Sequence, residues 1–316
     1  MSKRFVNIDP SVKGRKNLFS ALKWQLRGGA KKWPKKVHNS HTPQLAETIA
    51  DNEVAITYIN HSTFLLQLKD STILTDPIFS QRAGPLSLIG PKRVRPPGIS
   101  LQALPKIDLV LISHNHYDHM DIPSIRALWK RDKPLFIVPL GNGHILQSQG
   151  ISNVIELTWW QEHALGNERI LLTPAQHWSG RGIFDHCKAL WGGYLIISHN
   201  LKILFAGDSG YNTHFQEIYK KYGSIDVSLL PIGAYEPRWF MREHHMNPQE
   251  AVQAHLDLGS CLSVGTHFGT FRLTNEGIDD PVVDLKKSLK SHSLDEKAFV
   301  TLEHGQTVWY RKKEHA

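Results

Sequence analysis

One stretch, LVLISHNHYDHMD at residues 109–121, constrains the fold of this chain more than any other. Its first five residues, Leu109–Ser113, form a nearly continuous apolar run, as in strands that are buried on both faces of a sheet. Three histidines and two aspartates follow directly. So many titratable side chains at the end of a buried strand are costly unless they bind a cation or one another. The stretch therefore predicts a buried sheet with a metal site at one end.

The spacing within the cluster favours two neighbouring metal positions. Residues two apart share one side of an extended chain, so His114 and His116 can reach the same ion. A turn at Tyr117 would direct Asp118 and His119 to a second position nearby. Imidazole and carboxylate ligands without thiolate suit zinc, with iron and manganese as alternatives, and the lack of cysteine argues against a closed structural site.

Three more apolar runs end on a residue that can bind a metal. LLTPAQH ends at His177, ILFAGD ends at Asp208 and LSVGTH ends at His267. Each one alone is a weak indication, because Asp and His at a strand end are often turn residues. Together with the cluster they are a strong one, since α/β folds build sites from ligands that converge at the carboxyl ends of strands.

From Glu53 onward the pattern is that of a mixed α/β body. The expected strands are Val54–Tyr58, Phe64–Leu68, Ser71–Thr75, Leu109–Ser113, Leu135–Pro139, Ile170–Thr173, Gly193–Ser198, Lys202–Ala206, Val227–Pro231 and Leu262–Thr266. A helix is expected over Ser124–Lys130. Another helix should begin at Asn247, because Asn caps a helix, proline fits its first turn and Glu250 completes a capping box. The order of elements indicates two central sheets sandwiched by helices.

The positive charge of the chain is concentrated at its N-terminus. Residues 1–36 contain eleven Lys or Arg and a single acidic residue, which gives them a net charge of +10. Since the whole chain carries +8, the remaining residues carry a net charge of −2. A basic face across the body is therefore not expected, and we expect no nucleic-acid partner.

Within this N-terminal arm, Asn17–Arg27 has the pattern of an amphipathic helix that ends at Gly28 and Gly29. Its expected apolar face consists of Leu18, Phe19, Leu22 and Leu26. A basic amphipathic helix can lie on an anionic membrane surface, and its apolar face can equally dock on the core of its own protein. The sequence leaves both alternatives open.

Composition places the chain among soluble globular proteins. It has no apolar run of the ~20 residues needed to span a bilayer and no apolar segment typical of a secretory signal. Cys187 and Cys261 are too few for a disulfide framework, so we expect a protein of the reducing cytoplasm, either free or at a membrane surface. We expect both thiols to be buried. Residues 33–50, with prolines among polar residues, are typical of a linker. We therefore divide the chain into a basic arm at 1–50 and a catalytic domain at 51–316.

At this point the chain resembles a known family. The motif HxHxDH at residues 114–119, followed by His177, Asp208 and His267, resembles the pattern of the metallo-β-lactamase superfamily. The fold of that superfamily is an α/β four-layer αββα sandwich. Further segments resemble the branch that contains N-acyl-phosphatidylethanolamine phospholipase D: ILTDPIFS, GPKRVRPPG, LISHNHYDH, VPLGNG, PAQHWSGRG, FAGDSGY, PIGAYEPRWFM and HFGTF. The resemblance covers roughly residues 53–310. Its motifs are specific for the branch, though not for the substrate.

The resemblance implies a ligand set for two zinc ions per chain. One zinc would be held by His114, His116 and His177. The other would be held by Asp118, His119 and His267, and Asp208 would bridge the pair.

Other positions acquire expected roles from the same resemblance. Asp76 matches a residue that supports the ligand loop from behind, and His61 lies near a branch motif and could do the same. His245 matches a histidine that orients substrate or protonates the leaving group, although the adjacent His244 leaves open which of the two faces the cleft. Phe268 stands where the branch usually has tryptophan, which should reshape the cleft wall. Several aromatic residues suit either an acyl groove or ordinary core packing: Trp159, Trp160, Trp178, Tyr235, Trp239 and Phe240.

The implied activity is phospholipase D-type cleavage of N-acyl-phosphatidylethanolamine-like phospholipids by a hydroxide bridging the two zinc ions. Two carboxylates and one hydroxide do not neutralise two zinc ions, so the site would stay cationic and attract an anionic diester. Two alternatives remain: a hydrolase of the same fold that acts on another ester or a lactone, and a membrane-surface scaffold with structural metals. The expected partners are a phospholipid or other small ester and a peripheral membrane surface, and the sequence leaves a homodimer open.

Overall fold

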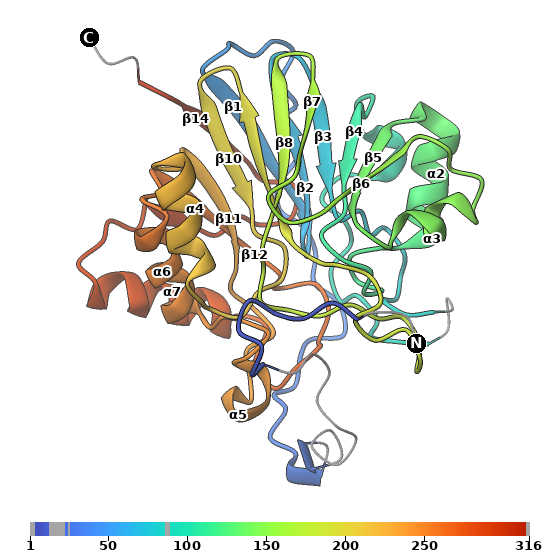
Figure 1. Ribbon diagram of the computed structural model, residues 1–316. Helices are drawn as coiled ribbons and strands as arrows, with labels where there is room; N and C mark the ends of the chain where they lie inside the picture. The colour runs from blue at the N-terminus through green and yellow to red at the C-terminus, as the bar shows by residue number, and fades with distance from the viewer. Residues whose placement is uncertain (1–3, 13–22, 25, 86–88, 314–316) are drawn as a thin grey trace.

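Two seven-stranded mixed sheets lie face to face, and helices cover the outer face of each (Figure 1). The computed structural model describes residues 4–12, 23–24, 26–85 and 89–313. Helices, sheet, sheet and helices form four layers, which is the predicted arrangement.

The first sheet combines strands from both ends of the body. In the order of pairing its strands are β14 (Thr307–Arg311), β1 (Glu53–Asn60), β2 (Thr63–Gln67), β3 (Thr72–Thr75), β4 (Leu109–Leu111), β5 (Leu135–Pro139) and β6 (Val154–Leu157). Neighbours are antiparallel from β14 to β3 and parallel from β3 to β6. Helices α2 (Ile122–Asp132) and α3 (Gly143–Gln147) pack on its outer face.

The second sheet contains the strands that lead to the remaining predicted ligands. In the order of pairing they are β13 (Phe299–Val300), β12 (Leu262–Thr266), β11 (Val227–Pro231), β10 (Leu201–Phe205), β9 (Gly193–Ser198), β8 (Glu168–Thr173) and β7 (Glu162–Leu165). Its outer face is covered by α4 (His214–Tyr222), α6 (Pro248–Asp257) and α7 (Asp280–Ser291). Strands β8, β10 and β12 run in the same direction, so their carboxyl ends lie at one edge.

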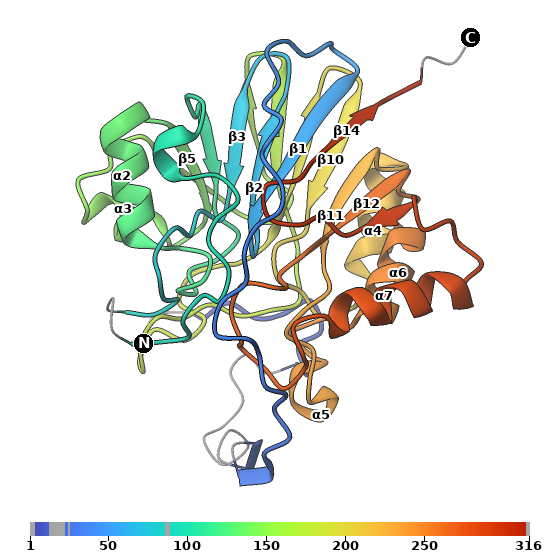
Figure 2. The same ribbon diagram turned by 180° about the vertical axis from the view of Figure 1, so that it is seen from behind.

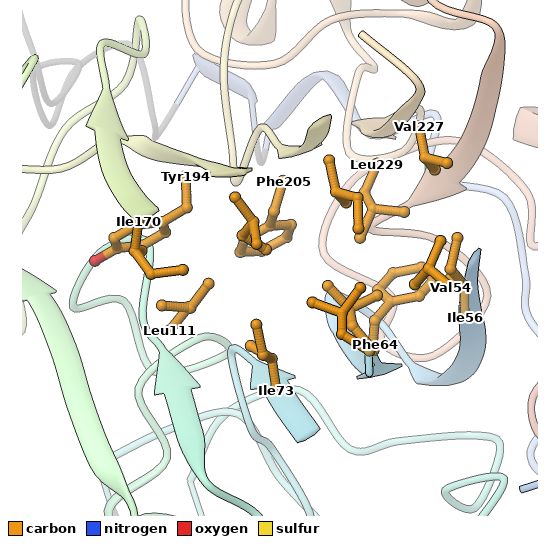
Figure 3. Packing of buried hydrophobic residues seen from close by; sticks show 14 of the residues in the cluster. Val54, Ile56, Phe64, Ile73, Leu111, Ile170, Tyr194, Phe205, Val227 and Leu229 are labelled. Carbon is orange, nitrogen blue, oxygen red and sulfur yellow. The ribbon is translucent and has the colours of Figure 1, made fainter. Parts of the chain in front are cut away.

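Alternation along single strands separates the core into layers. In β4, Leu109 and Leu111 pack between the two sheets, whereas Val110 packs on the opposite face, toward α2. Figure 3 shows the central layer, in which Leu111 and Ile73 of the first sheet face Ile170 and Phe205 of the second. A strand with apolar residues at every position is thus buried on both faces, as the continuous run predicts.

All the predicted strands and both predicted helices of the body are present. Strands β5, β9, β11 and β12 have the predicted bounds, and the other predicted elements differ at one or both ends. The predicted capping box of Asn247 and Glu250 is confirmed at the start of α6. Strand β4 ends at Leu111 rather than at Ser113, because the Asp76 carboxylate, not a neighbouring strand, accepts the Ser113 N–H at 2.7 Å. Further elements that no sequence pattern predicted are α3, α4, α5 (Arg238–Met241), α7, β6, β7, β13 and β14.

The N-terminal arm contacts the body at several points. The Phe5 N–H donates to the Cys187 carbonyl at 2.8 Å, and the Val37 N–H donates to the Val94 carbonyl at 2.8 Å. Residues 33–50 form neither helix nor strand. Of the predicted helix over Asn17–Arg27, residues 23, 24, 26 and 27 are helical, and the rest, with Leu18, Phe19 and Leu22, lies outside the described residues.

Two further expectations concern cysteine burial and membrane spanning. Cys187 is buried as expected, but the expectation for Cys261 is wrong: its side chain is exposed. It directly precedes β12, at the rim of the sheet, and so belongs to neither core layer. Within the described ranges, no helix has the length and apolar character needed to cross a bilayer.

Candidate metal centre

The seven predicted ligands come from four segments that meet at one edge of the two sheets. His114, His116, Asp118 and His119 follow β4, and His177, Asp208 and His267 follow β8, β10 and β12. The structure brings all seven together, and their side-chain distances define two groups that share one carboxylate.

The first group consists of three imidazoles. His114 Nε2 lies 2.9 Å from His116 Nδ1, and His177 Nε2 lies 3.3 Å from the same atom. These three side chains are grouped closely enough for their nitrogens to bind one ion.

The second group combines two imidazoles with a carboxylate. Asp118 Oδ2 lies 3.4 Å from His119 Nε2 and 3.5 Å from His267 Nε2. His61, which the sequence analysis left open, reaches the same carboxylate: its Nε2 lies 3.0 Å from Asp118 Oδ2. His61 thus contacts the second group from its buried side.

Asp208 lies between the two groups. Its Oδ2 is 3.1 Å from His267 Nε2 and 3.2 Å from His119 Nε2 in the second group. The same oxygen is 3.8 Å from His177 Nε2 and 4.0 Å from His114 Nε2 in the first. This is the position from which one carboxylate can bridge two ions.

Hydrogen bonds behind the imidazoles assign their tautomers. His177 Nδ1 donates to the His244 carbonyl at 3.0 Å, and His119 Nδ1 donates to Asp76 Oδ2 at 2.6 Å. The Ser113 hydroxyl donates to Asp76 at 2.6 Å, so it accepts from His114 Nδ1 at 2.9 Å. Each of these three rings is then left with a lone pair on Nε2 that points into the cluster.

Convergent lone pairs and carboxylates repel one another unless cations lie between them. His119 Nε2 and His267 Nε2 are buried, and although both lie close to Asp208 Oδ2, neither contact has the geometry of a hydrogen bond. Outer partners that fix the tautomer of a ligand are a common feature of metal-binding histidines. The donor set, five imidazoles and two carboxylates, therefore fits two metal ions.

The electrostatics without metal agree with this interpretation. Burial and the neighbouring histidines hold the pKa values of His114 and His116 well below the usual range. Burial acts in the same direction on His267, but Asp208 and Asp118 outweigh it and raise its pKa to about 9. Burial alone would raise the pKa of Asp208, yet His119 and His267 hold it well below its usual value. Metal ions would replace the protons that balance these carboxylates.

The backbone is strained where it supports the site. His61, Asp76 and His267 have positive φ angles of 47°, 34° and 64°, a region that residues other than glycine seldom adopt. Gly207, before Asp208, has φ of +62°, and a Cβ there would lie 2.7 Å from the Ser113 Cβ. Such strain often marks functional sites.

The metal centre opens into a cleft of about 280 Å³. Both His244 and His245 line it, but their contacts with the centre differ. His244 contributes its carbonyl to His177, whereas His245 Nδ1 lies 3.9 Å from Asp208 Oδ2. Burial lowers the pKa of His245 to about 3, so its ring is neutral at pH 7.

The remaining wall of the cleft is largely apolar. Of the aromatic residues considered above, Trp178 and Phe240 line it. Phe268 stacks on Tyr58 with ring centroids 5.6 Å apart and packs on the core between the sheets. Trp24 of the arm also lines the cleft, which no sequence pattern predicted. A larger open depression of about 820 Å³, lined by Asp51, His199 and Lys312 among others, contains none of the seven ligands.

Fold and site together define a metal-dependent hydrolase built on two stacked sheets. The chain belongs to the metallo-β-lactamase superfamily: residues 71–268 match the beta-lactamase superfamily domain. It is 41% identical over 236 residues to an uncharacterized protein of Mycobacterium tuberculosis, covering 73% of this chain and 63% of the relative, so it spans less than two thirds of that relative. It is 37% identical over 266 residues to the N-acyl-phosphatidylethanolamine-hydrolyzing phospholipase D 1 of Caenorhabditis elegans, covering 80% of this chain and 74% of the relative.

A solved structure confirms the predicted fold class. Igni18, a metallo hydrolase from the archaeon Ignicoccus hospitalis, superposes with a TM-score of 0.62 at 24% identity. The match covers 83% of this chain and all of that chain (100%). At this identity the likeness concerns the fold alone.

Proposed function

We propose that the protein is a binuclear zinc phosphodiesterase of phospholipase D type that acts on N-acyl-phosphatidylethanolamine-like phospholipids. The observation that carries the proposal is the position of Asp208, whose Oδ2 lies within 4.0 Å of ring nitrogens from both groups of ligands. The Caenorhabditis elegans relative, whose name gives this activity, supports the choice of substrate.

The donor set suits an anionic diester. When bound, two zinc ions lower the pKa of a bound water to about 7 and stabilise the charge that develops on the phosphoryl oxygens. Five of the seven ligands are imidazoles, and Asp118 and Asp208 are the two carboxylates. The protein therefore leaves net positive charge at the centre, which attracts the single negative charge of a phosphodiester.

We assign His245 the task of orienting the substrate. Its ring lies in the cleft, 3.9 Å from Asp208, and is neutral at pH 7. A neutral imidazole can donate one hydrogen bond to a substrate oxygen, but it holds no additional proton for a leaving group. Of its two expected roles, orientation therefore fits better.

We also propose an anionic membrane surface as a partner of the arm. Leu26 and Trp239 expose 79% and 41% of their surface. Lys23 and Arg27 lie over the Trp239 ring, at 5.6 and 5.3 Å from its centroid. Exposed apolar side chains among basic ones are typical of segments that bind a membrane surface, and here they lie beside the cleft.

The test is to incubate the zinc-loaded protein with a total lipid extract and identify the products by mass spectrometry. We expect release of N-acylethanolamines together with phosphatidic acid. Asp208→Asn should abolish this, while Asp51→Asn, an exposed aspartate paired with Lys69, should retain the wild-type rate. Hydrolysis of added esters or lactones with intact phospholipids would instead support the alternative hydrolase. Phospholipid cleavage that survives Asp208→Asn would place the chemistry elsewhere.

A further inference from the structure

The N-terminal arm supplies part of the wall of the cleft that contains the metal centre. Trp24 lines this cleft together with His116, Asp208 and His267, although the arm precedes β1 and lies outside both sheets. Figures 1 and 2 show the described arm helix beside α5, below the edge of the sheets where the ligands converge. We call residues 23, 24, 26 and 27 the arm turn.

One asparagine fixes the arm turn to the body on both sides of the indole. The Trp24 Nε1–H donates to Asn275 Oδ1 at 2.9 Å, and Asn275 Nδ2 donates to the Gly28 carbonyl at 3.0 Å. The Lys31 N–H donates to the Asn275 carbonyl at 2.8 Å. Both ends of the Asn275 amide thus hold the arm, which sets the depth at which the indole enters the cleft.

The arm turn and α5 form one aromatic unit. The Trp24 and Phe240 rings have centroids 5.1 Å apart, within the range of favourable aromatic pairs. On the outer side, Lys23 and Arg27 cover the Trp239 ring of the same short helix. Trp24 therefore faces inward while the basic residues of the same turn face outward.

The apolar part of the cleft lies beside the predicted metal ligands. Trp24, Phe240, Met241 and Leu273 line the same 280 Å³ as the metal ligands. This volume is slightly below the ~300–1,000 Å³ of typical small-molecule sites, so the cleft has room for a phosphate and nearby carbons but not for a whole lipid. An alkyl segment next to the phosphate would leave water on contact with the indole.

We propose that Trp24 is a specificity-determining residue, which selects phosphodiesters that carry an apolar chain within reach of the indole when the phosphate lies at the metal ligands. This inference rests on the proposed function for the type of substrate, but the contact itself is a property of the cleft. Burial of one methylene is worth up to about a fourfold gain in affinity. The indole should therefore make binding depend on chain length.

The experiment measures binding of n-alkyl phosphonates, from methyl to octyl, to the zinc-loaded protein by calorimetry, below their micelle concentrations. In the wild type, affinity should rise with chain length until the cleft is filled. Trp24→Ala should lower the octyl-to-methyl affinity ratio at least tenfold, whereas Trp24→Phe should retain most of it. Trp33→Ala is the matched control, since Trp33 is another arm tryptophan that donates to the neighbouring Glu276 carbonyl at 2.9 Å but does not line the cleft.

Asn275→Ala provides a second variant that frees the indole without altering it, and it decides the matter if Trp24→Ala does not fold. On alkyl p-nitrophenyl phosphates, both variants should raise KM for long chains and change kcat little. An octyl-to-methyl ratio within threefold of the wild type in Trp24→Ala would overturn the inference. Chain-dependent binding that Trp24→Ala loses, in a protein that cleaves no phospholipid, would refute the proposed function and leave this inference standing.

Discussion

Asp76 Oδ2 lies 2.6 Å from His119 Nδ1, and through Ser113 the same carboxylate also holds His114. One buried side chain thus orients a ligand from each of the two groups. Because it lies behind the rings, it controls the metal centre without facing the cleft.

Asp76→Asn should therefore weaken zinc binding. The amide keeps the volume of the side chain but removes the charge that fixes the His119 tautomer, and loss of such an outer partner typically costs 10–100-fold in metal affinity. Competition with a chromophoric chelator measures the change. Asp121→Asn is the matched control: Asp121 is a buried acid between β4 and α2 that binds Ser80 and Ser124 and none of the ligands. The zinc affinity of this variant should stay within threefold of the wild type. Equal zinc affinity in Asp76→Asn and wild type would contradict the assigned role.

The metal content of the purified protein is a second prediction. Two groups of ligands that share Asp208 should hold about two zinc ions per chain, and elemental analysis measures the number. Asp208→Asn should retain fewer, because the amide cannot balance two cations. One ion or none in the wild type, after loading with excess zinc and gel filtration, would contradict the binuclear mechanism.

The adjacent histidines should differ in their effect on turnover. His245→Gln removes a side chain that faces Asp208 in the cleft, and we expect kcat/KM on a phosphodiester to fall by about 10- to 100-fold, or about 1.4 to 2.7 kcal/mol. His244→Gln keeps the carbonyl that accepts from His177 Nδ1, so its kcat/KM should fall less than tenfold. Steady-state kinetics of zinc-saturated variants test this, and a larger loss in His244→Gln would reverse the assignment.

The predicted ligand positions follow from local patterns, whereas other parts of the site depend on distant contacts. The apolar run from Leu109 through Ile112 is too short for a typical buried helix, so it predicts a strand between two layers with the polar cluster at its end. The short strand β7 has an alternating exposed and half-buried pattern and lies at the edge of its sheet, so the sequence gives it little signal. Trp24 contacts Asn275, 251 positions away, and no local pattern predicts such a pair.

Family resemblance and physical pattern contributed different information. The pattern alone predicted metal ligands at four strand ends and two metal positions within the cluster. The resemblance alone assigned His177, Asp208 and His267 to those two positions. The structure adds the contacts by which Asp76 and His61 support the ligands, namely the Asp76–Ser113–His114 hydrogen bonds and the contact of His61 with Asp118. His61 and Asp76 make these contacts from positions with positive φ angles, and such backbone angles cannot be predicted from the residue types His and Asp.

A buried histidine away from the metal centre should make stability depend on pH. Burial lowers the pKa of His304 to about 3, and its ring donates to the Pro96 carbonyl at 3.0 Å and accepts from Thr270 Oγ1 at 3.1 Å. In an unfolded chain its pKa is about 6.5. Between these values the unfolded state binds more protons than the folded state, so this contribution to stability is complete above about pH 6.5 and is lost as the pH falls toward 3.

His304→Gln removes this titration. At pH 7 the variant should have a lower free energy of unfolding than the wild type, because glutamine places its hydrogen bonds less well. At pH 5 the wild type has lost part of the His304 contribution, so the difference in the free energy of unfolding should be about 2 kcal/mol smaller. Urea unfolding at both pH values measures it. His38→Gln, at an exposed position, should give the same small difference at both. If the free energies of unfolding of His304→Gln and wild type differ by the same amount at both pH values, the His304 ring does not lose stability by protonation and the prediction is wrong.

The arm turn should bring the protein to anionic membranes through its basic residues. Lys23 and Arg27 each contribute about 1 kcal/mol near a charged bilayer, so removal of both charges in Lys23→Gln/Arg27→Gln should lower partitioning into phosphatidylglycerol vesicles about 30-fold. Sedimentation with vesicles at low salt measures this, and raising the salt should narrow the difference because the attraction is screened.

The matched control removes the same charge from a helix on the far side of the second sheet. Lys286→Gln/Lys290→Gln changes two exposed lysines of α7 and should leave partitioning within threefold of the wild type if the arm turn is the point of contact. Equal losses in both double variants would mean that net charge, rather than this surface, governs binding. Unchanged partitioning in Lys23→Gln/Arg27→Gln would mean that the arm turn serves the cleft alone, since Trp24 would still form part of its wall.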